Sequence, residues 1–207
     1  MGHVILVSLA WTIGTLAAIV VWRRVFAAPM PRVFDPILNT SFRRRTFGPE
    51  VAAERHGLAP GMRVLEVGPA GGYLTAAALR KIEPGGRLVS IDVQLPLLRK
   101  LRMRLGPDTP PLVCGDATRL PFHAGSFDLL FVVEVMGEIP NVAGALAEFR
   151  RVLRPGGILA VSEAALFDPD YVRFPVLMRL ARSAGFEPRE GYPQRFQYTQ
   201  RFVAPAV

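Results

Sequence analysis

The sequence predicts an α/β protein with a doubly wound, mostly parallel sheet, preceded by one transmembrane helix. Two observations predict the sheet. From residue 50 onward, short apolar runs alternate with amphipathic segments, and turns containing glycine or proline separate them. A third observation predicts the helix, because the 19 residues from 4 to 22 carry no charge. Strands that alternate with helices form parallel sheets covered on both faces, so one domain is expected over residues 50–207.

Residues 1–22 are expected to form the transmembrane anchor. At the rise of an α-helix, residues 4–22 would extend over roughly 28 Å, which is close to the hydrocarbon thickness of a bilayer. No polar stripe marks this stretch as a buried core helix, and Trp22 falls where interfacial aromatic side chains belong. A secretory signal peptide is the alternative, since residues 25–27 resemble a cleavage site, but no lysine or arginine precedes the apolar stretch.

Arginines gather directly after this stretch, in a basic linker expected over residues 23–49. They are Arg23, Arg24, Arg32, Arg43, Arg44 and Arg45, with Asp35 as the only acid among them. Positive charge beside a span favours the cytoplasmic side, which predicts a single-pass membrane protein with its domain in the cytoplasm. The arginines and phenylalanines of residues 32–47 are expected to lie on lipid head groups and to form a lid over the site.

The formal net charge of +8 comes from 25 basic and 17 acidic residues. We expect it to attract anionic lipids. Nucleic acid is not expected as a partner, because the basic residues are not interleaved with exposed aromatic residues in a recognisable module. The single Cys114 excludes an internal disulfide, and the three histidines have no metal-ligand spacing, so no metal site is expected. The sequence leaves the oligomeric state open.

Seven strands and five helices are expected in the domain. The strands are residues 63–67, 87–92, 112–114, 127–134 and 158–162, followed by an antiparallel hairpin from residue 186 that ends in the run 196–203. The helices are residues 50–56, 72–82, 94–105, 142–153 and 171–184. The run 127–134 is apolar almost throughout, as in a strand buried on both faces, and Pro155-Gly156-Gly157 predicts a break before the fifth strand.

The first expected strand ends in an acid, and a glycine-rich turn follows it, as Glu66-Val-Gly68-Pro-Ala70-Gly-Gly72. In doubly wound domains such a turn opens a nucleotide site at the carboxyl end of the first strand. A carboxylate at Glu66 would repel a pyrophosphate and attract an ammonium or sulfonium group. The turn therefore predicts a nucleotide-like ligand with a positive end, of which S-adenosylmethionine is the common example.

Four signals in order resemble the class I S-adenosylmethionine-dependent methyltransferases. They are Glu66-x-Gly68-x-Ala70-x-Gly72; Ile91-Asp92; Gly115-Asp116-Ala117 with Leu120-Pro121-Phe122 and Ser126-Phe127-Asp128; and the helix-to-strand join over residues 149–157. The resemblance covers about residues 49–203 and is closest to the branch that includes quinone-biosynthesis and lipid methyltransferases. It implies a Rossmann-like sheet of seven strands and S-adenosyl-L-methionine as the cofactor.

The resemblance also implies the cofactor-binding residues. They are Glu66, Gly68, Ala70, Gly72, Asp92, Asp116 and Ala117. Glu66 would help to hold the methionine end, Asp92 the ribose hydroxyls, and Asp116 the adenine amino group. Leu120 or Phe122 would pack on the adenine face. The alternative for each acid is a helix cap or a turn residue.

The chain departs from the family pattern at Ala70, which replaces the middle glycine of the turn. A methyl group there narrows the turn and weakens cofactor binding if the position needs a positive φ. Gly71 beside it is expected to supply the lost freedom, so a shifted site is predicted rather than a lost one.

The residues do not assign a catalytic base. Methyl transfer from a sulfonium is an in-line displacement, for which positioning and desolvation supply most of the effect. Glu134 and Glu138 after the fourth strand are weak candidates, with capping or ion pairing as an equal alternative, and His56, Tyr192 and Tyr198 are more remote. Tyr73, Phe122 and Met136 line the pocket or belong to the core.

The predicted function is methyl transfer to a small lipophilic or membrane-associated acceptor, such as a phospholipid or a quinone. A non-catalytic, membrane-anchored nucleotide-binding module is the first alternative, although all three ligand acids are present. An NAD-dependent oxidoreductase is the second, although residues 68–72 do not supply its G-x-G-x-x-G pattern. A soluble-acceptor methyltransferase with a tethering helix is the third.

Overall fold

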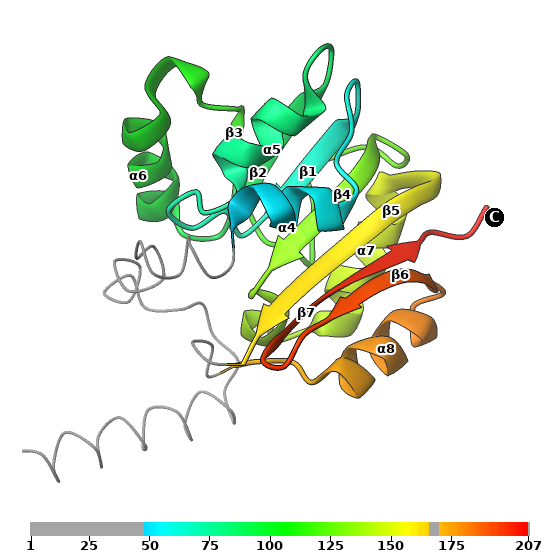
Figure 1. The fold of residues 1–207 in the computed structure, drawn as a ribbon. Coiled ribbons are helices and arrows are strands. Elements are labelled where there is room, and N and C mark those ends of the chain that lie inside the picture. Colours follow the sequence, from blue (N-terminus) through cyan, green and yellow to red (C-terminus); the bar gives the residue numbers. More distant parts are fainter. Residues whose placement is uncertain (1–47, 166–169, 207) are drawn as a thin grey trace, which may run out of the picture.

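The computed structural model describes residues 48–165 and 170–206 (Figure 1). The predicted anchor of residues 1–22 lies outside them, as does the predicted basic linker of residues 23–49 apart from its last two positions. In the two ranges that are described, no helix is both long and apolar enough to cross a bilayer. The anchor and its orientation therefore stay predictions.

The described residues form one mixed sheet of seven strands. The strands are β1 (Arg63–Val67), β2 (Arg87–Asp92), β3 (Leu112–Cys114), β4 (Phe127–Val133), β5 (Leu153–Ala164), β6 (Glu187–Pro193) and β7 (Gln197–Val203). Their order across the sheet is β3-β2-β1-β4-β5-β7-β6. Strands β1 to β5 run parallel, and β7 is antiparallel to both of its neighbours. The predicted mostly parallel sheet and its C-terminal hairpin are confirmed.

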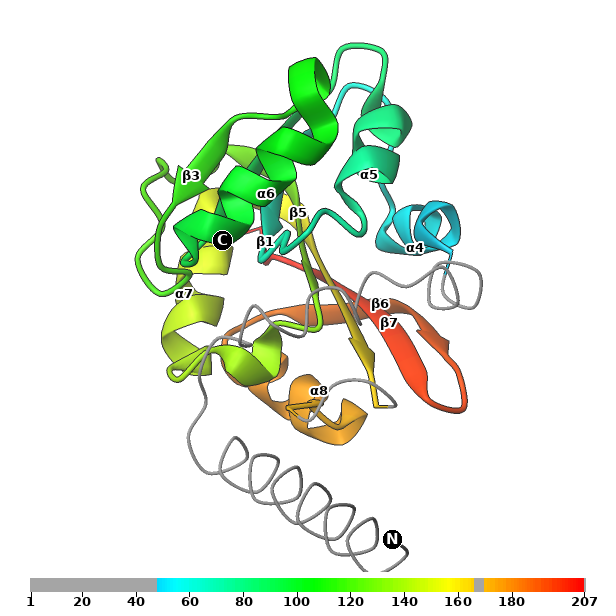
Figure 2. The ribbon, with the colours of Figure 1, turned by 90° about the vertical axis from the view of Figure 1, so that its left-hand side faces the viewer.

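Helices cover both faces of this sheet. They are α4 (Pro49–His56), α5 (Thr75–Ile82), α6 (Leu95–Leu105), α7 (Val142–Val152) and α8 (Phe174–Ser183), with two short 3-10 helices, η2 (Gly106–Asp108) and η3 (Met136–Glu138). Helices α4, α5 and α6 lie on one face, and α7 and α8 lie on the other (Figures 1 and 2). The chain is therefore doubly wound, as predicted.

The two faces have separate hydrophobic cores. Val64 and Leu129 pack with α4 and α5, whereas Leu65 and Leu130 pack with α7 and α8. Successive side chains of a strand point to opposite faces, so the central strands must be apolar on both sides. One polar side chain, Glu66, is buried in β1 among these apolar neighbours.

Two helices begin three residues later than predicted, each for a local reason. Helix α5 begins at Thr75 instead of residue 72, because Gly72 has a φ of +79°, a left-handed conformation that no helical residue adopts. Helix α8 begins at Phe174 instead of residue 171, and Pro175 occupies its first turn, where the missing N–H costs nothing.

Strand β5 is longer than predicted, because the expected break at residues 155–157 is a bulge inside it. The pairing with β4 shifts between the pairs Phe127–Leu153 and Leu129–Ile158, so several residues of β5 stand opposite one residue of β4. Gly156, with a φ of +72°, supplies the left-handed conformation within this bulge. Helix α7 therefore continues into β5 without a separate loop.

Candidate functional site

The candidate site lies at the carboxyl ends of the parallel strands. The chain proceeds outward from β1 through β2 to β3, then returns to place β4 and β5 on the other side of β1. The strand order thus reverses between β1 and β4, and open α/β sheets bind ligands in the crevice at this point. The acids predicted to bind the cofactor lie at or near this end of their strands: Glu66 within β1, Asp92 as the last residue of β2, and Asp116 just after β3.

The two predicted turn glycines are required by the packing of the protein itself. Gly68 and Gly72 have φ values of +72° and +79°. A Cβ on Gly68 would lie 2.4 Å from Val135 Cγ2, and one on Gly72 would lie 2.4 Å from Leu101 Cδ1. Both distances are far below van der Waals contact, so neither position accepts a larger residue without displacement. The close approach that these glycines allow is therefore made to the neighbouring loop at Val135 and to α6 at Leu101.

Ala70, which replaces the middle glycine of the family pattern, has a positive φ in the structure. Its φ is +47°, while Gly71 beside it is not left-handed. The expectation that Gly71 would take over this conformation is wrong, because the turn keeps its geometry and the alanine adopts it. A left-handed conformation costs a non-glycine residue about 1–2 kcal/mol. Arg104 on α6 donates to the carbonyl oxygen of Gly71 and helps to hold the turn.

Glu66 is buried beneath the turn and bound by hydroxyl groups. Thr75 Oγ1 donates to both carboxylate oxygens at 3.0 and 2.9 Å, and Ser90 Oγ donates to Oε2 at 2.6 Å. Burial raises the pKa of Glu66 to about 7, against the effect of these hydrogen bonds. Because only 2% of Glu66 is exposed, it offers almost no surface to a ligand at the open edge. Its predicted contact with the methionine end therefore needs a movement of the turn.

Asp92, at the end of β2, joins the turn to the start of α6. Its Oδ1 accepts from the backbone N–H of Gln94 at 2.8 Å, and its Oδ2 accepts from that of Ala70 at 3.4 Å. Burial raises the pKa of this carboxyl group, while both hydrogen bonds lower it. Each oxygen retains a further lone pair, so the carboxylate can accept from two vicinal hydroxyl groups.

Asp116 lies on the exposed loop after β3. Its Oδ1 accepts from the backbone N–H of Thr118 at 2.8 Å, which is the turn-closing role kept as an alternative for each acid. Oδ2 is the oxygen left for a ligand, and Ala117 beside it packs partly against the core. Between this loop and the turn, Val93 exposes an apolar side chain directly after Asp92. Sequence reasoning missed Val93, although its position directly after a strand-end acid was a signal for it.

An ion pair on α7 holds the loop that carries the third sequence signal. Glu148 and Arg151 are paired, with Arg151 Nε 2.7 Å from Glu148 Oε1. Arg151 also donates to the carbonyl oxygens of Leu120 and Phe122 at 2.9 and 2.7 Å, and Glu148 Oε2 accepts from the backbone N–H of Leu120 at 2.7 Å. Sequence reasoning missed this role of both residues, although Arg151 lies within the fourth signal, because each contact joins positions at least 28 residues apart.

The weak candidates for a base separate into two groups. Glu134 and Glu138 lie after β4 at the candidate edge, Glu134 with a φ of +54° and Glu138 in η3. His56 instead belongs to the core. Its Nδ1 is 2.6 Å from the carbonyl oxygen of Ala52, its Nε2 is 3.0 Å from Ser162 Oγ, and burial lowers its pKa to about 4. A histidine with both ring nitrogens bound inside the fold is unsuited to take a proton at the edge.

The tyrosines and Met136 are also held in the fold. Tyr198 is buried and donates to the carbonyl oxygen of Val172 at 2.6 Å, and Met136 is fully buried. Tyr192 donates to Glu190 at 2.9 Å within the β6–β7 hairpin, away from β1 and β2. Of the aromatic pocket candidates, Tyr73 and Phe122 stay partly exposed at the edge.

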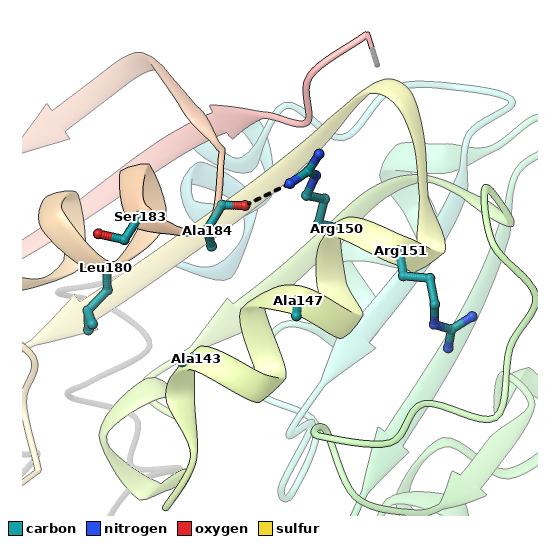
Figure 3. Close-up of a pocket in the computed structure, with 7 residues that line it drawn as sticks. All are labelled: Ala143, Ala147, Arg150, Arg151, Leu180, Ser183 and Ala184. Atoms are coloured by element: carbon teal, nitrogen blue, oxygen red, sulfur yellow. Dashed lines mark hydrogen bonds between the residues drawn. The ribbon is translucent and has the colours of Figure 1, made fainter.

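A separate groove of about 560 Å³ lies between α7 and α8 (Figure 3). Ala143, Ala147, Arg150, Arg151, Leu180, Ser183 and Ala184 line it. Arg150 reaches across it to the carbonyl oxygen of Ala184 at 3.5 Å. None of the predicted cofactor residues lines this groove.

The residues at the candidate edge suit S-adenosyl-L-methionine. Asp92 presents a carboxylate whose two oxygens suit a pair of ribose hydroxyls. Val93 and Phe122 present apolar surface that suits the adenine ring. Acids lie where a pyrophosphate site would need hydrogen-bond donors. The strand order β3-β2-β1-β4-β5-β7-β6 and these features are those that the resemblance to the class I S-adenosylmethionine-dependent methyltransferases implies.

Comparisons with known proteins support this class. Residues 65–161 match the family described as "Methyltransferase domain". The chain is 38% identical over 107 residues to the ubiquinone/menaquinone biosynthesis C-methyltransferase UbiE of Burkholderia vietnamiensis, covering 50% of this chain and 44% of that protein. It is 37% identical over 110 residues to the enzyme of the same description from Cupriavidus necator, covering 52% and 45%.

The fold is also similar to solved structures. A SAM dependent methyltransferase from Aquifex aeolicus superposes with a TM-score of 0.77 over 84% of this chain and 99% of that chain, at 18% identity. At this identity the likeness concerns the fold alone. The chain spans less than half the length of the two curated relatives. Residues 65–161 are therefore the part of the chain in which both the sequence and the fold are similar to known methyltransferases.

Proposed function

We propose that the chain transfers the methyl group of S-adenosyl-L-methionine to a small lipophilic acceptor, of the isoprenoid quinone kind, at the cytoplasmic face of a membrane. The observation that supports this cofactor is the carboxylate of Asp92, which accepts from the turn at Ala70 where the strand order reverses. Negative charge there disfavours a pyrophosphate and favours a sulfonium or ammonium group. The relatives named as quinone C-methyltransferases support the acceptor half.

The residues would divide the work of binding between the two ends of the site. Asp92 accepts from the ribose hydroxyls, and Asp116 accepts from the adenine amino group next to the apolar side chain of Val93. Glu66 supports the turn through Thr75 and Ser90 rather than through an exposed surface. When bound, the cofactor supplies an electrophilic methyl group on a sulfonium, and the protein contributes orientation and exclusion of water. No base is assigned, and Glu134 and Glu138 stay candidates.

The membrane half of the proposal rests on the sequence before α4. Residues 4–22 carry no charge and arginines follow them, so the proposal makes the protein single-pass with its domain in the cytoplasm. A domain tied to a bilayer meets lipid-soluble acceptors at a raised local concentration. Deletion of residues 1–28 should preserve cofactor binding and reduce turnover of an acceptor embedded in vesicles. Equal turnover by the truncated chain would show that the anchor explanation is wrong.

The donor is tested by calorimetry of the full chain in detergent with S-adenosylhomocysteine and with NAD. We expect binding of the first and none of the second, and the reverse result would favour the oxidoreductase alternative. The acceptor is tested by transfer of a labelled methyl group into membrane lipid extracts, a demethylated isoprenoid quinone and phospholipid vesicles, followed by mass spectrometry. Binding of S-adenosylhomocysteine with no transfer in any arm would favour the non-catalytic module.

A further inference from the structure

Two exposed aromatic side chains, from α8 and from the β6–β7 turn, each stand next to an exposed arginine. Phe174 begins α8 and is 38% exposed, and Phe196 in the turn between β6 and β7 is 45% exposed. Arg173 and Arg195 precede them in the chain and are both exposed. We call these four residues the hairpin rim.

The fold brings the hairpin rim to the same edge as the cofactor residues. Strand β6 runs in the same direction as β5, since both are antiparallel to β7, so the turn after β6 lies at the carboxyl edge of the sheet. Phe196 is tied to that edge, because its carbonyl oxygen accepts from the backbone N–H of Ala165 just after β5, at 2.8 Å. Helix α8 and the β6–β7 turn lie close together at this end of the molecule in Figure 1.

Each ring of the rim contacts one neighbouring side chain and stays partly exposed to solvent. The ring of Phe174 contacts that of the buried Tyr198, with centroids 5.3 Å apart at 74°. The guanidinium of Arg195 lies 5.0 Å from the centroid of the Phe196 ring. These contacts keep both aromatic groups on the surface, where their exposure costs hydrophobic free energy unless something covers them.

We propose that the hairpin rim rests on the surface of an anionic bilayer and turns the candidate site towards it. Aromatic side chains with adjacent arginines have the composition of a segment that inserts shallowly between lipid head groups. The charges complement an anionic lipid, because both exposed charges of the rim are positive, whereas the neighbouring acids Glu163 and Asp170 are buried. This inference rests on the proposed membrane location.

The rim supplies an orientation that the proposed anchor alone does not. Residues 23–47 would reach about 85 Å if fully extended, which is several times the radius of a domain of this size. A tether of that reach limits the distance from the bilayer but leaves the direction of the domain open. A second contact at the carboxyl edge fixes this direction and brings lipid-soluble acceptors to the same edge as the cofactor.

The test places single tryptophans in the full chain and measures their contact with lipid. Trp11 and Trp22 are replaced by phenylalanine, and F174W, F196W or M103W is introduced. Met103 is the matched control, because it is 79% exposed on α6, which packs against β2 and β3 at the opposite end of the sheet from the β6–β7 hairpin. The proteins are reconstituted in vesicles of phosphatidylcholine and phosphatidylglycerol, with or without bromine on the acyl chains.

We expect the brominated lipid to remove about half or more of the emission at positions 174 and 196, since rim residues inserting about 5–10 Å reach the upper acyl chains. Position 103 should lose almost none. In the F174W background, R195Q should lower the docked-to-undocked ratio on anionic vesicles about fivefold, from about 1 kcal/mol per basic residue, whereas R102Q should not.

Three results would overturn the proposal. Sedimentation with vesicles but no quenching at either rim position would leave the anchor standing and show that the rim faces something other than lipid. Equal quenching at position 103 would show that the domain has no preferred face. Absence from the vesicle fraction would reject the anchor and the rim together. Calorimetry with S-adenosylhomocysteine reports separately on the proposed donor and shows that each variant is folded.

Discussion

The two edges of the sheet use carboxylates in opposite ways. At the amino edge, two arginines bind Asp128, which lies at the start of β4. They are Arg63, the first residue of β1, and Arg154, the second residue of β5. The distances are 2.8 Å from the backbone N–H of Arg63, 3.3 Å from its Nε and 2.7 Å from Arg154 Nε. Although desolvation acts against it, these hydrogen bonds hold the pKa of Asp128 at about 2.

At the carboxyl edge the same chemical group is held by neutral donors. Glu66 accepts from hydroxyl groups and Asp92 from backbone N–H groups, and burial raises the pKa of both. The amino edge thus satisfies its carboxylate with charged partners, while at the carboxyl edge Glu66 is satisfied by hydroxyl groups and Asp92 retains lone pairs that a hydroxyl-bearing ligand would satisfy. Perturbed acids of this kind mark functional sites more often than paired ones do.

The largest expected effect separates the two edges by ligand binding. D92N should weaken the binding of S-adenosylhomocysteine about 100-fold, because it removes hydrogen bonds to a charged acceptor worth roughly 2–3 kcal/mol. D128N is the matched control at the amino edge and should leave the affinity unchanged. Calorimetry of both variants measures the difference. Equal loss in both would mean that the two edges do not differ in function.

The second effect concerns the dependence of stability on pH. The folded pKa of Glu66, about 7, lies above its unfolded value of 4.5, so only the folded state holds this proton between those values. The contribution of Glu66 to stability is complete below pH 4.5 and is lost as the pH rises through 7. E66Q should therefore gain up to about 3 kcal/mol over the wild type between pH 5 and pH 8. Urea unfolding at the two values measures this gain, and parallel curves would contradict it.

The third effect is the loss of stability at the amino edge. D128N should lower the free energy of unfolding at pH 7 by about 1–2 kcal/mol, a value reduced because Arg63 and Arg154 are half-exposed and screened by solvent. The folded pKa of Asp128 lies below its unfolded value of 3.8, so this difference should vanish as the pH falls from 3.8 through 2. Urea titrations at pH 7 and pH 2 compare the two conditions, with D108N on η2 as an exposed control.

The smallest effect tests the turn itself. A70G should raise the free energy of unfolding by about 0.5–1 kcal/mol, since relief of the left-handed alanine exceeds the entropy that glycine adds to the unfolded chain. G72A is the opposite substitution in the same turn and should be destabilising, because its Cβ would meet Leu101. Thermal unfolding of both variants measures the signs. Destabilisation by A70G would mean that the methyl group contributes packing that outweighs its strain.

Much of the fold could be predicted, because its signals are local. The bounds of β1 and β2 agree with the predicted apolar runs, since hydrophobic periodicity and glycine turns lie within a few residues of one another. The starts of α5 and α8 were missed because neither has a capping side chain, so the positive φ of Gly72 and the position of Pro175 decide them. The predicted roles of the acids stay predictions.

The surroundings of the site could not be predicted, because they depend on contacts between distant parts of the chain. Ser90 meets Glu66 only through the register of β1 and β2. Val135 and Leu101 confine the turn glycines from a loop and a helix that the sequence pattern does not connect with them. The same holds for Arg63 and Asp128, which are 65 residues apart.

The ion pair of Glu148 and Arg151 has a consequence for the entropy of cofactor binding. It fixes the backbone at Leu120 and Phe122, on the side of the site where the resemblance places adenine. Ordering three loop residues costs roughly 3–6 kcal/mol in backbone entropy. Because this cost is incurred when the domain folds, the loop is already ordered when it meets a ligand. A loop that became ordered only on binding would lose affinity by this entropic cost, and the loop at Leu120 and Phe122 does not.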